Sequence, residues 1–244
     1  MNEAPWSLIG KQFTSESKFA SIVTDRITPI PQDVANEIEW AGLRPLSVTT
    51  QVSSDLLIRA ARWIDHVPDV GSLCVELMQQ MYLLQADEGY DVSHSEPRWP
   101  RSIFVSIPNR LDCVGALRLA ESIVHEVMHL QLTNFEQEEA LVEDFEAKLH
   151  SPWRSEDRPA QGVMHGLYVF ACLISFFREI AEVEQLEPKA REHSQRRILE
   201  IQSEIGEISL DELKRSLTHK GKDLVVRWRS EAISDVVRNR PEHL

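Results

Sequence analysis

The stretch ESIVHEVMHLQL, residues 121–132, carries two histidines four positions apart and a glutamate directly after the first. An α-helix advances by about 100° per residue, so His125 and His129 would share one face and direct two imidazoles toward one ion. Glu126 would lie beside that pair, where its carboxylate can hydrogen-bond a metal-bound water. The same spacing also occurs in ordinary core or surface histidines. Here it stands centrally in an apolar helical pattern, and we interpret it as a metal site.

Apolar residues recur at helical spacing around this motif, which predicts a buried helix from Leu111 to Leu132. A loop is expected at 150–162, where Pro152, Pro159 and Gly162 interrupt the pattern. The further helices expected downstream are 134–149, with Leu141, Phe145 and Leu149 one turn apart; 163–184; and two amphipathic helices within 187–240, broken near 206–209 and again near Gly221.

In the N-terminal half, apolar residues recur at less regular spacing. Residues 1–50 are expected to be irregular, because prolines 5, 29, 31 and 45 interrupt them. A helix is expected at 53–67. Strands are expected around 72–84, which could equally be a helix, and around 101–108, with the polar loop 87–100 between them. The helix at 53–67 would bury Leu56, Leu57, Ala60, Ala61 and Ile64 on one face.

These patterns predict a mainly α protein with a small β-sheet, an α+β fold. The helix that carries HExxH would be central and packed against later helices, with amphipathic helices at the C-terminus. We expect residues 1–244 to form a single domain. Its metal-site core would cover about 90–184, and a helical extension would cover 187–240.

Charge and cysteine content limit the classes of partner. Lys and Arg total 26 against 39 Asp and Glu, a net charge of −13 that repels phosphate backbones but tolerates a basic or neutral peptide. The three cysteines form no CxxC pair, which argues against a disulfide framework or a thiolate metal site. The N-terminus has no signal-peptide pattern. The apolar run GLYVFACLISFF, residues 166–177, is too short to span a bilayer and indicates a buried helix. We expect a cytoplasmic protein without nucleic-acid or membrane partners.

A catalytic ion usually has a third protein ligand, and the residues alone leave its identity open. The metzincin pattern fails, because Leu132 and Phe135 stand where its glycine and third histidine belong. His165 is favoured, since it begins an apolar helix between two glycines, and Glu143 is second. The other candidates are Glu139, Asp144 and His150.

Two further sets of polar residues fit a site of this kind. Arg154 and Arg158, in SPWRSEDRPAQG, are ordinarily surface charges or partners of nearby acids, yet either could hold a carboxylate bidentately. That would suit a dicarboxylate cosubstrate. Ser93 and Ser95 are either ordinary turn residues or a small polar set at the mouth of the site.

Three blocks of the sequence together resemble a known family. SHSEP with RSIFVSIP, then AESIVHEVMHLQL, then SPWRSEDRPAQGVMHGLYVF are similar to the HExxH-motif peptide-modification family, whose members are described as 2-oxoglutarate-dependent peptide β-hydroxylases of ribosomally synthesised, post-translationally modified peptide pathways. The matching blocks span about 90–180.

The resemblance implies an Fe(II) centre, 2-oxoglutarate and O₂, and hydroxylation at the β-carbon of a residue in a precursor peptide, with release of succinate and CO₂. It implies His125, His129 and His165 as metal ligands, and Arg154 or Arg158 as the residue that binds 2-oxoglutarate. Non-haem iron oxygenases usually use two histidines and one carboxylate, so three histidines would depart from that pattern. In such an enzyme Glu126 need only orient a ligand or a water.

Two other functions stay open on the sequence. In a zinc metallopeptidase, zinc would lower the pKa of bound water and Glu126 would take its proton as general base. In a scaffold or binding module the histidines would be structural. Zinc also accepts imidazole, so it is a substitute ion for the same ligands.

Overall fold

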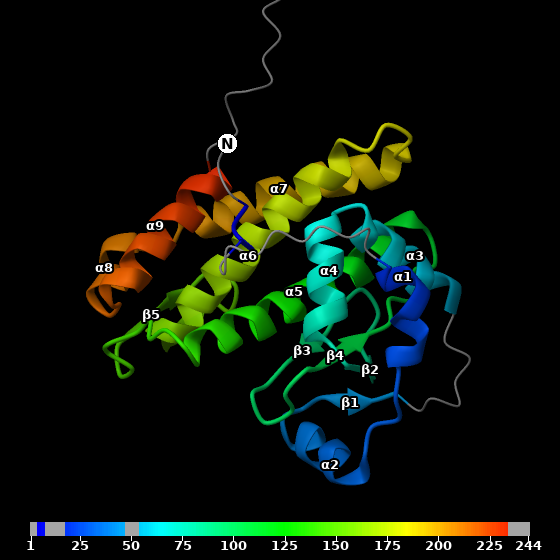
Figure 1. Ribbon diagram of the computed structural model, residues 1–244, viewed down its shortest axis with the longest axis horizontal. Helices are drawn as coiled ribbons and strands as arrows, with labels where there is room; N and C mark the ends of the chain where they lie inside the picture. Colours follow the sequence, from blue (N-terminus) through cyan, green and yellow to red (C-terminus); the bar gives the residue numbers. More distant parts are fainter. Residues whose placement is uncertain (1–3, 8–17, 47–53, 234–244) are drawn as a thin grey trace, which may run out of the picture. The chain divides into compact units, whose positions relative to one another are not determined.

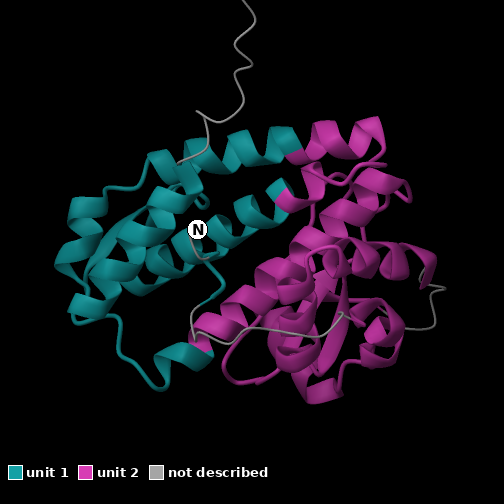
Figure 2. Ribbon diagram, turned by 45° about the horizontal axis from the view of Figure 1, so that its top comes forward, with its two compact units in different colours: residues 1–11, 134–178, 195–244 teal, residues 12–133, 179–194 magenta. Residues whose placement is uncertain are grey.

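The computed structural model describes residues 4–7, 18–46 and 54–233. It is 59% helical, with a sheet of four strands and a sheet of two, which confirms the mainly α fold with a small β component. The chain divides into two compact units, shown in Figure 2, and each is described by itself. Unit 1 comprises 1–11, 134–178 and 195–244, and unit 2 comprises 12–133 and 179–194.

This division follows neither the expected metal-site core nor the expected C-terminal extension. Three long helices, α5, α6 and α7, each contribute residues to both units. The prediction of a single domain stays a prediction.

Unit 2 contains the four-stranded sheet, in the order β1-β2-β4-β3 (Figure 1). The central strands β2 and β4 are parallel and the two outer pairs are antiparallel. Every residue of β4 is buried, as expected of a strand covered on both faces. The strands are β1 (Arg44–Pro45), β2 (Gln80–Gln85), β3 (Ser93–His94) and β4 (Ser102–Ser106).

The N-terminal helices of unit 2 are short and are joined to one another by specific contacts. The expected helix at 53–67 is confirmed as α3, and its five predicted core residues are buried. At its end, the Asp65 carboxylate accepts the backbone N–H groups of Phe19 and Ala20 at 3.0 and 2.9 Å and so holds the start of α1. The elements are α1 (Phe19–Ile22), the 3₁₀ helix η1 (Val23–Arg26), α2 (Gln32–Trp40), α3 (Ser54–Asp65) and α4 (Pro68–Leu77).

Two expectations for this half need correction. Residues 18–46 are not irregular, because Pro31 precedes α2 rather than interrupting it, and its carbonyl accepts the Ala35 N–H. The rest of 1–50, apart from 4–7, lies outside the described residues. The segment 72–84 is neither one strand nor one helix: α4 ends at Leu77 and β2 begins at Gln80. A short apolar run fits both periodicities, so its division depends on tertiary pairing.

The helix that carries HExxH is α5 (Cys113–Glu136), which confirms the predicted helix and extends it by one turn. The Asp112 carboxylate accepts the Gly115 N–H at 3.0 Å and caps its N-terminus. Most of its residues up to Leu132 are buried. The helix therefore presents little of its surface to solvent.

Unit 1 contains a hairpin followed by helices, and α8 and α9 lie side by side in it (Figure 1). Residues Lys148 to Ser151 pair antiparallel with Glu156 to Pro159, and Ser155 in the turn has a positive φ of 51°. The predicted loop at 150–162 is therefore largely a hairpin. The elements are β5 (Lys148–Ser151), β6 (Glu156–Pro159), α6 (Ala160–Ala181), α7 (Pro188–Gly206), α8 (Leu210–Arg215) and α9 (His219–Ile233).

The predicted helix at 134–149 is wrong. After α5 ends, the N–H groups of Glu143 and Asp144 both donate to the Ser216 carbonyl, and the Asp144 carboxylate accepts the N–H groups of Glu146 and Ala147. Backbone groups paired in this way cannot form helical hydrogen bonds. Phe145, expected on the buried face, is 60% exposed.

Helix α6 confirms the predicted buried helix but is longer than its apolar run. By length and composition alone, this helix of 22 residues could cross a membrane, which corrects the expectation that the segment is too short. Yet 78% of its most apolar window is buried within the protein, as in the core helix of a soluble protein.

The described C-terminal helices are interrupted twice, as expected. The break after Gly206 is confirmed, and the second lies at 216–218, just before Gly221, which itself is in the first turn of α9. A Cβ at Gly221 would lie 2.3 Å from the Leu141 carbonyl oxygen. Glycine at this position therefore allows the two backbone segments to approach closely. A Cβ at Gly206 would meet nothing within 4 Å.

We therefore expect Gly221→Ala to lower the free energy of unfolding and Gly206→Ala to raise it. Helix propensity favours alanine at both positions, by less than the roughly 1 kcal/mol of a helix interior, because Gly206 ends α7 and Gly221 lies in the first turn of α9. At Gly221 the contact with a backbone oxygen should outweigh that gain and lower the free energy of unfolding by about 1–3 kcal/mol, as overpacking does. Urea unfolding of the two variants measures the difference. Equal stability would show that Leu141 does not approach Gly221 closely.

Candidate metal centre

The two histidines of the motif belong to a single half-buried stripe on α5, within unit 2. From residue 121 to residue 133 the incompletely buried positions are Glu121, His125, His129 and Thr133, one turn apart, and every position between them is buried. The imidazole centroids of His125 and His129 are 4.9 Å apart and the rings are inclined at 65°. This confirms that the pair shares one face. Two imidazoles on the accessible side of a rigid helix are well placed to bind one ion.

Glu126 is buried beside this stripe and its carboxylate is hydrogen-bonded. The residue is 3% exposed, and the Ser95 hydroxyl donates to its Oε2 at 2.6 Å. The other oxygen, Oε1, lies 4.0 Å from Nε2 of His125. A buried carboxylate is costly unless it is hydrogen-bonded, so Ser95 supports a group that the interior would otherwise disfavour.

The segment around Ser95 is held by contacts on both of its sides. Ser93 and His94 form β3, and the His94 backbone pairs with Phe104. Arg98 donates to Glu96 at 2.8 Å, a hydrogen bond that lowers the pKa of that carboxyl. Of the two predicted serines, Ser95 contacts the motif, whereas the Ser93 hydroxyl makes no hydrogen bond to the described residues.

His165 lies on α6 in unit 1, where it contacts a carboxylate that the sequence reasoning missed. Its Nε2 is 2.7 Å from Oε2 of Glu136, the last residue of α5, and Gln161 donates to the same oxygen at 3.0 Å. The side chains of His165 and Glu136 are 15% and 13% exposed. Helix spacing could have pointed to both partners, because Glu136 follows His129 by two turns and Gln161 precedes His165 by one.

The glycine after His165 accommodates a tryptophan. A Cβ at Gly166 would lie 2.3 Å from the indole ring of Trp153, which itself stacks on Phe170 with centroids 4.8 Å apart. The turn of the β5–β6 hairpin is thereby packed on α6. Packing therefore accounts for the glycine of the HG pair without a ligand.

The two candidate arginines differ in their surroundings. Arg154 is exposed in the hairpin turn, whereas Arg158 is half-buried on β6. The Arg158 guanidinium lies 3.4 Å from where a Cβ of Gly162 would be, in the first turn of α6. Neither arginine forms an ion pair with a carboxylate among the described residues.

The other candidates for a third ligand lie at exposed positions. Glu139, Glu143 and Asp144 are exposed in the segment after α5, and His150 is exposed on β5 opposite Asp157. In residues 4–7, 18–46 and 54–233 no group of three or more His, Cys, Asp or Glu side chains is placed to hold a metal. The identity of the third ligand stays a prediction.

The three cysteines are free and buried. Burial raises the pKa of Cys74, Cys113 and Cys172 above that of an ordinary thiol. A raised pKa keeps the metal-binding and nucleophilic thiolate form rare.

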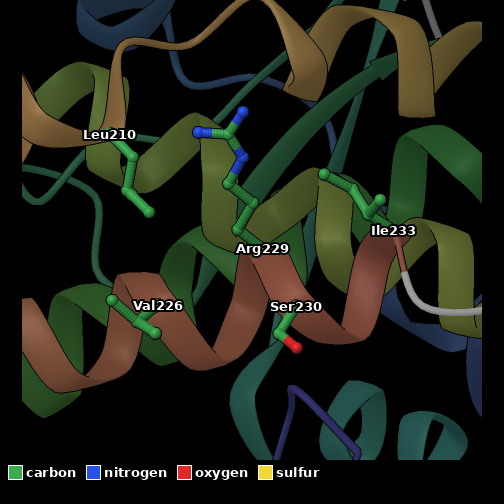
Figure 3. Close-up of a pocket in the computed structure, with 5 residues that line it drawn as sticks. All are labelled: Leu210, Val226, Arg229, Ser230 and Ile233. Carbon is green, nitrogen blue, oxygen red and sulfur yellow. The ribbon is translucent and has the colours of Figure 1, made fainter.

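A separate cavity of about 360 Å³ lies in unit 1, against α9 and the start of α8 (Figure 3). It is lined by Leu210, Val226, Arg229, Ser230 and Ile233. None of the predicted site residues contributes to it.

No family model matches the chain, and a search of the curated proteins finds no similar sequence. The resemblance of the three sequence blocks therefore stays a prediction.

We expect Ser95→Ala to lower the free energy of unfolding by about 1.5–3 kcal/mol, the usual worth of a hydrogen bond to a charged group. Ser93→Ala, two residues earlier, should change it by less than about 0.5 kcal/mol, as surface substitutions do. Urea unfolding of both variants is the measurement. Equal losses in the two would mean that the Ser95–Glu126 hydrogen bond contributes no specific stability.

Proposed function

We propose that this protein is a cytoplasmic Fe(II)/2-oxoglutarate-dependent oxygenase that hydroxylates the β-carbon of a residue in a ribosomally made precursor peptide. One oxygen of O₂ enters the C–H bond as a hydroxyl and the other enters succinate, while 2-oxoglutarate loses CO₂. The observation that carries the proposal is the paired imidazoles on the half-buried stripe of α5, next to a carboxylate already held by Ser95.

The donor set suits the metal that the proposal requires. His125 and His129 would bind Fe(II), since neutral imidazole suits iron as it suits zinc. His165 is the proposed third ligand on the sequence resemblance alone. The bound iron, with 2-oxoglutarate and O₂, supplies the oxidising chemistry, and the residues of this chain bind and orient.

Glu126 is proposed as an orienting group. Its Oε2 is engaged by Ser95, which fixes the plane of the carboxylate beside His125. A carboxylate held in this way can keep a metal-binding histidine or a metal-bound water in one orientation.

Arg158, rather than Arg154, is proposed to bind 2-oxoglutarate. It is half-buried next to the first turn of α6, where the guanidinium and the helix N–H groups both favour an anion. Arg154 is exposed, and a carboxylate bound there would be more strongly screened by solvent.

One observation favours a second candidate, a zinc metallopeptidase. Oε1 of Glu126 lies 4.0 Å from His125 Nε2, so if zinc were held by the histidines, Glu126 would be the carboxylate that could take a proton from its water as general base. Such an enzyme would cleave its peptide without O₂ or 2-oxoglutarate.

The first test is an assay with protein purified without oxygen. With Fe(II), 2-oxoglutarate, O₂ and synthetic peptides that correspond to any short reading frames found beside its gene, we expect succinate and a peptide heavier by one oxygen atom, measured by mass spectrometry. His125→Ala and His129→Ala should abolish both products, whereas Glu139→Gln should not. Absence of succinate would contradict the proposal. Cleavage by zinc-loaded protein that Glu126→Gln abolishes would establish the peptidase instead.

The second test separates the two arginines. Arg158→Ala should raise the KM for 2-oxoglutarate by about 10–100-fold, which corresponds to losing one charge-assisted hydrogen bond of about 1.5–3 kcal/mol. Arg154→Ala should leave it within about threefold, as loss of an exposed charge does. Steady-state succinate formation at varied 2-oxoglutarate gives both values. The opposite ranking would assign the role to Arg154.

A further inference from the structure

We propose that the outer edge of β3 is a peptide-binding site, where an extended segment of a neutral or basic peptide adds to the sheet as a further strand. The inference deepens the proposed function, on which it rests only in taking a peptide as the substrate. It names where that peptide would lie in unit 2, beside the histidine pair of α5.

The backbone of Ser93 directs its hydrogen-bonding groups away from the sheet. The sheet order places β3 at one end, and within the part of the chain that the structure describes no strand pairs with its other side. The Val92 carbonyl accepts the Ser106 N–H at 2.8 Å, and the bonded residues alternate along an antiparallel pair. The N–H and C=O of Ser93 therefore face the outer edge, where an added strand would exchange two hydrogen bonds with them.

The edge that β3 offers is short. Ser93, His94 and Ser95 are each partly exposed, whereas Pro97 has no N–H and ends the run of possible donors. A short edge that ends in proline is protected against indiscriminate pairing with other sheets. Its few hydrogen bonds suit one short segment of peptide, so that side chains rather than the backbone would select the sequence.

Two contacts hold β3 alongside α5. Before the strand, Arg118 donates to the Asp91 carboxylate at 2.6 Å and to the Gly89 carbonyl at 3.0 Å. After it, Ser95 donates to Glu126 at 2.6 Å. Arg118 and Glu126 are about 12 Å apart along the helix, and the chain from Asp91 to Ser95 spans about 13 Å. The strand and the helix therefore run side by side in the same direction, and a strand added about 4.8 Å beyond β3 would follow the same course.

That course leads toward the histidine pair. Glu126, at the Ser95 end of β3, directly follows His125, and its Oε1 lies 4.0 Å from His125 Nε2. His129 lies one turn further along α5, in the direction in which β3 runs. A peptide on this edge would thus extend past Ser95 toward the half-buried stripe that carries both imidazoles.

The charge of the edge favours a neutral or basic segment. Residues 87–98 contain one arginine and four acids, which are Asp87, Glu88, Asp91 and Glu96. The arginine, Arg98, is already paired with Glu37 and Glu96, at 2.5 and 2.8 Å. An acidic segment would meet like charges along this edge, and such juxtaposition costs affinity.

The first measurement uses the full-length protein without metal, 2-oxoglutarate or O₂, so that its result does not depend on the proposed reaction. Binders are selected from a phage-displayed library of short random peptides, and the affinity of a selected synthetic peptide is measured by fluorescence anisotropy. Proline is tolerated on an edge strand whose N–H faces outward, so Ser93→Pro removes that donor and keeps the pairing with β4. It should bind the peptide about 3–10-fold more weakly than Ser93→Ala, which keeps the N–H, because one backbone hydrogen bond is lost.

Two further measurements need no substitution at Ser93. Amide hydrogen exchange followed by NMR should show the Ser93 N–H protected when the selected peptide is bound. Tyr90→p-benzoylphenylalanine, at an exposed position shortly before β3, should cross-link to the peptide on illumination. The matched control is Trp40→p-benzoylphenylalanine, which should not cross-link, because Trp40 is exposed at the end of α2, next to β1 at the opposite edge of the sheet.

Four results would each overturn the inference: no peptide recovered above background, equal affinities of Ser93→Pro and Ser93→Ala, an unprotected Ser93 N–H in the complex, or cross-linking from position 40 rather than position 90. None of them bears on the assay for succinate. Absence of succinate together with protection of Ser93 would contradict the oxygenase and leave the peptide site standing.

Discussion

A carboxylate inside a protein must be hydrogen-bonded, and this constraint joins α5 to the β3 segment in unit 2. Glu126 is buried on a helix whose other buried side chains are mostly apolar, and the Ser95 hydroxyl donates to it. Arg98 and Glu96 hold the segment that carries Ser95. The small sheet thus also positions a polar group, because β3 leads directly into Ser95, which hydrogen-bonds Glu126.

The helical spacing of the half-buried residues on α5 determines which side chains the helix presents on its accessible side. One residue per turn, from Glu121 through His125 and His129 to Thr133, remains half-buried while the rest of that stretch is enclosed. Such a helix is rigid, and its accessible side is a single narrow stripe of polar groups. Polar residues on the accessible side of an otherwise buried helix are the ordinary amphipathic pattern, and here two of the four are histidines one turn apart.

The sequence predicts the long elements well and the connections poorly. Helices α3, α5 and α6 have apolar spacing over several turns, which leaves little ambiguity. The segment 134–149 has the same spacing at Leu141, Phe145 and Leu149, yet its backbone hydrogen bonds go to Ser216, far along the chain. The same limit applies to the site: His125 and His129 follow from local spacing. Helix spacing places Glu136 on the histidine face of α5, but the contacts of Ser95 with Glu126 and of Glu136 with His165 join segments about 30 residues apart, which helix spacing alone does not pair.

Trp153 stacks into the space that Gly166 leaves open, and this contact joins the hairpin turn to the start of α6. The glycine is adjacent to the proposed ligand His165, and the tryptophan lies in the hairpin turn beside Arg154. Any side chain at 166 would displace the indole. In evolution the two positions should covary, so that a relative with a larger residue at 166 carries a smaller ring at 153, and the turn with its arginine would diverge together with the start of α6.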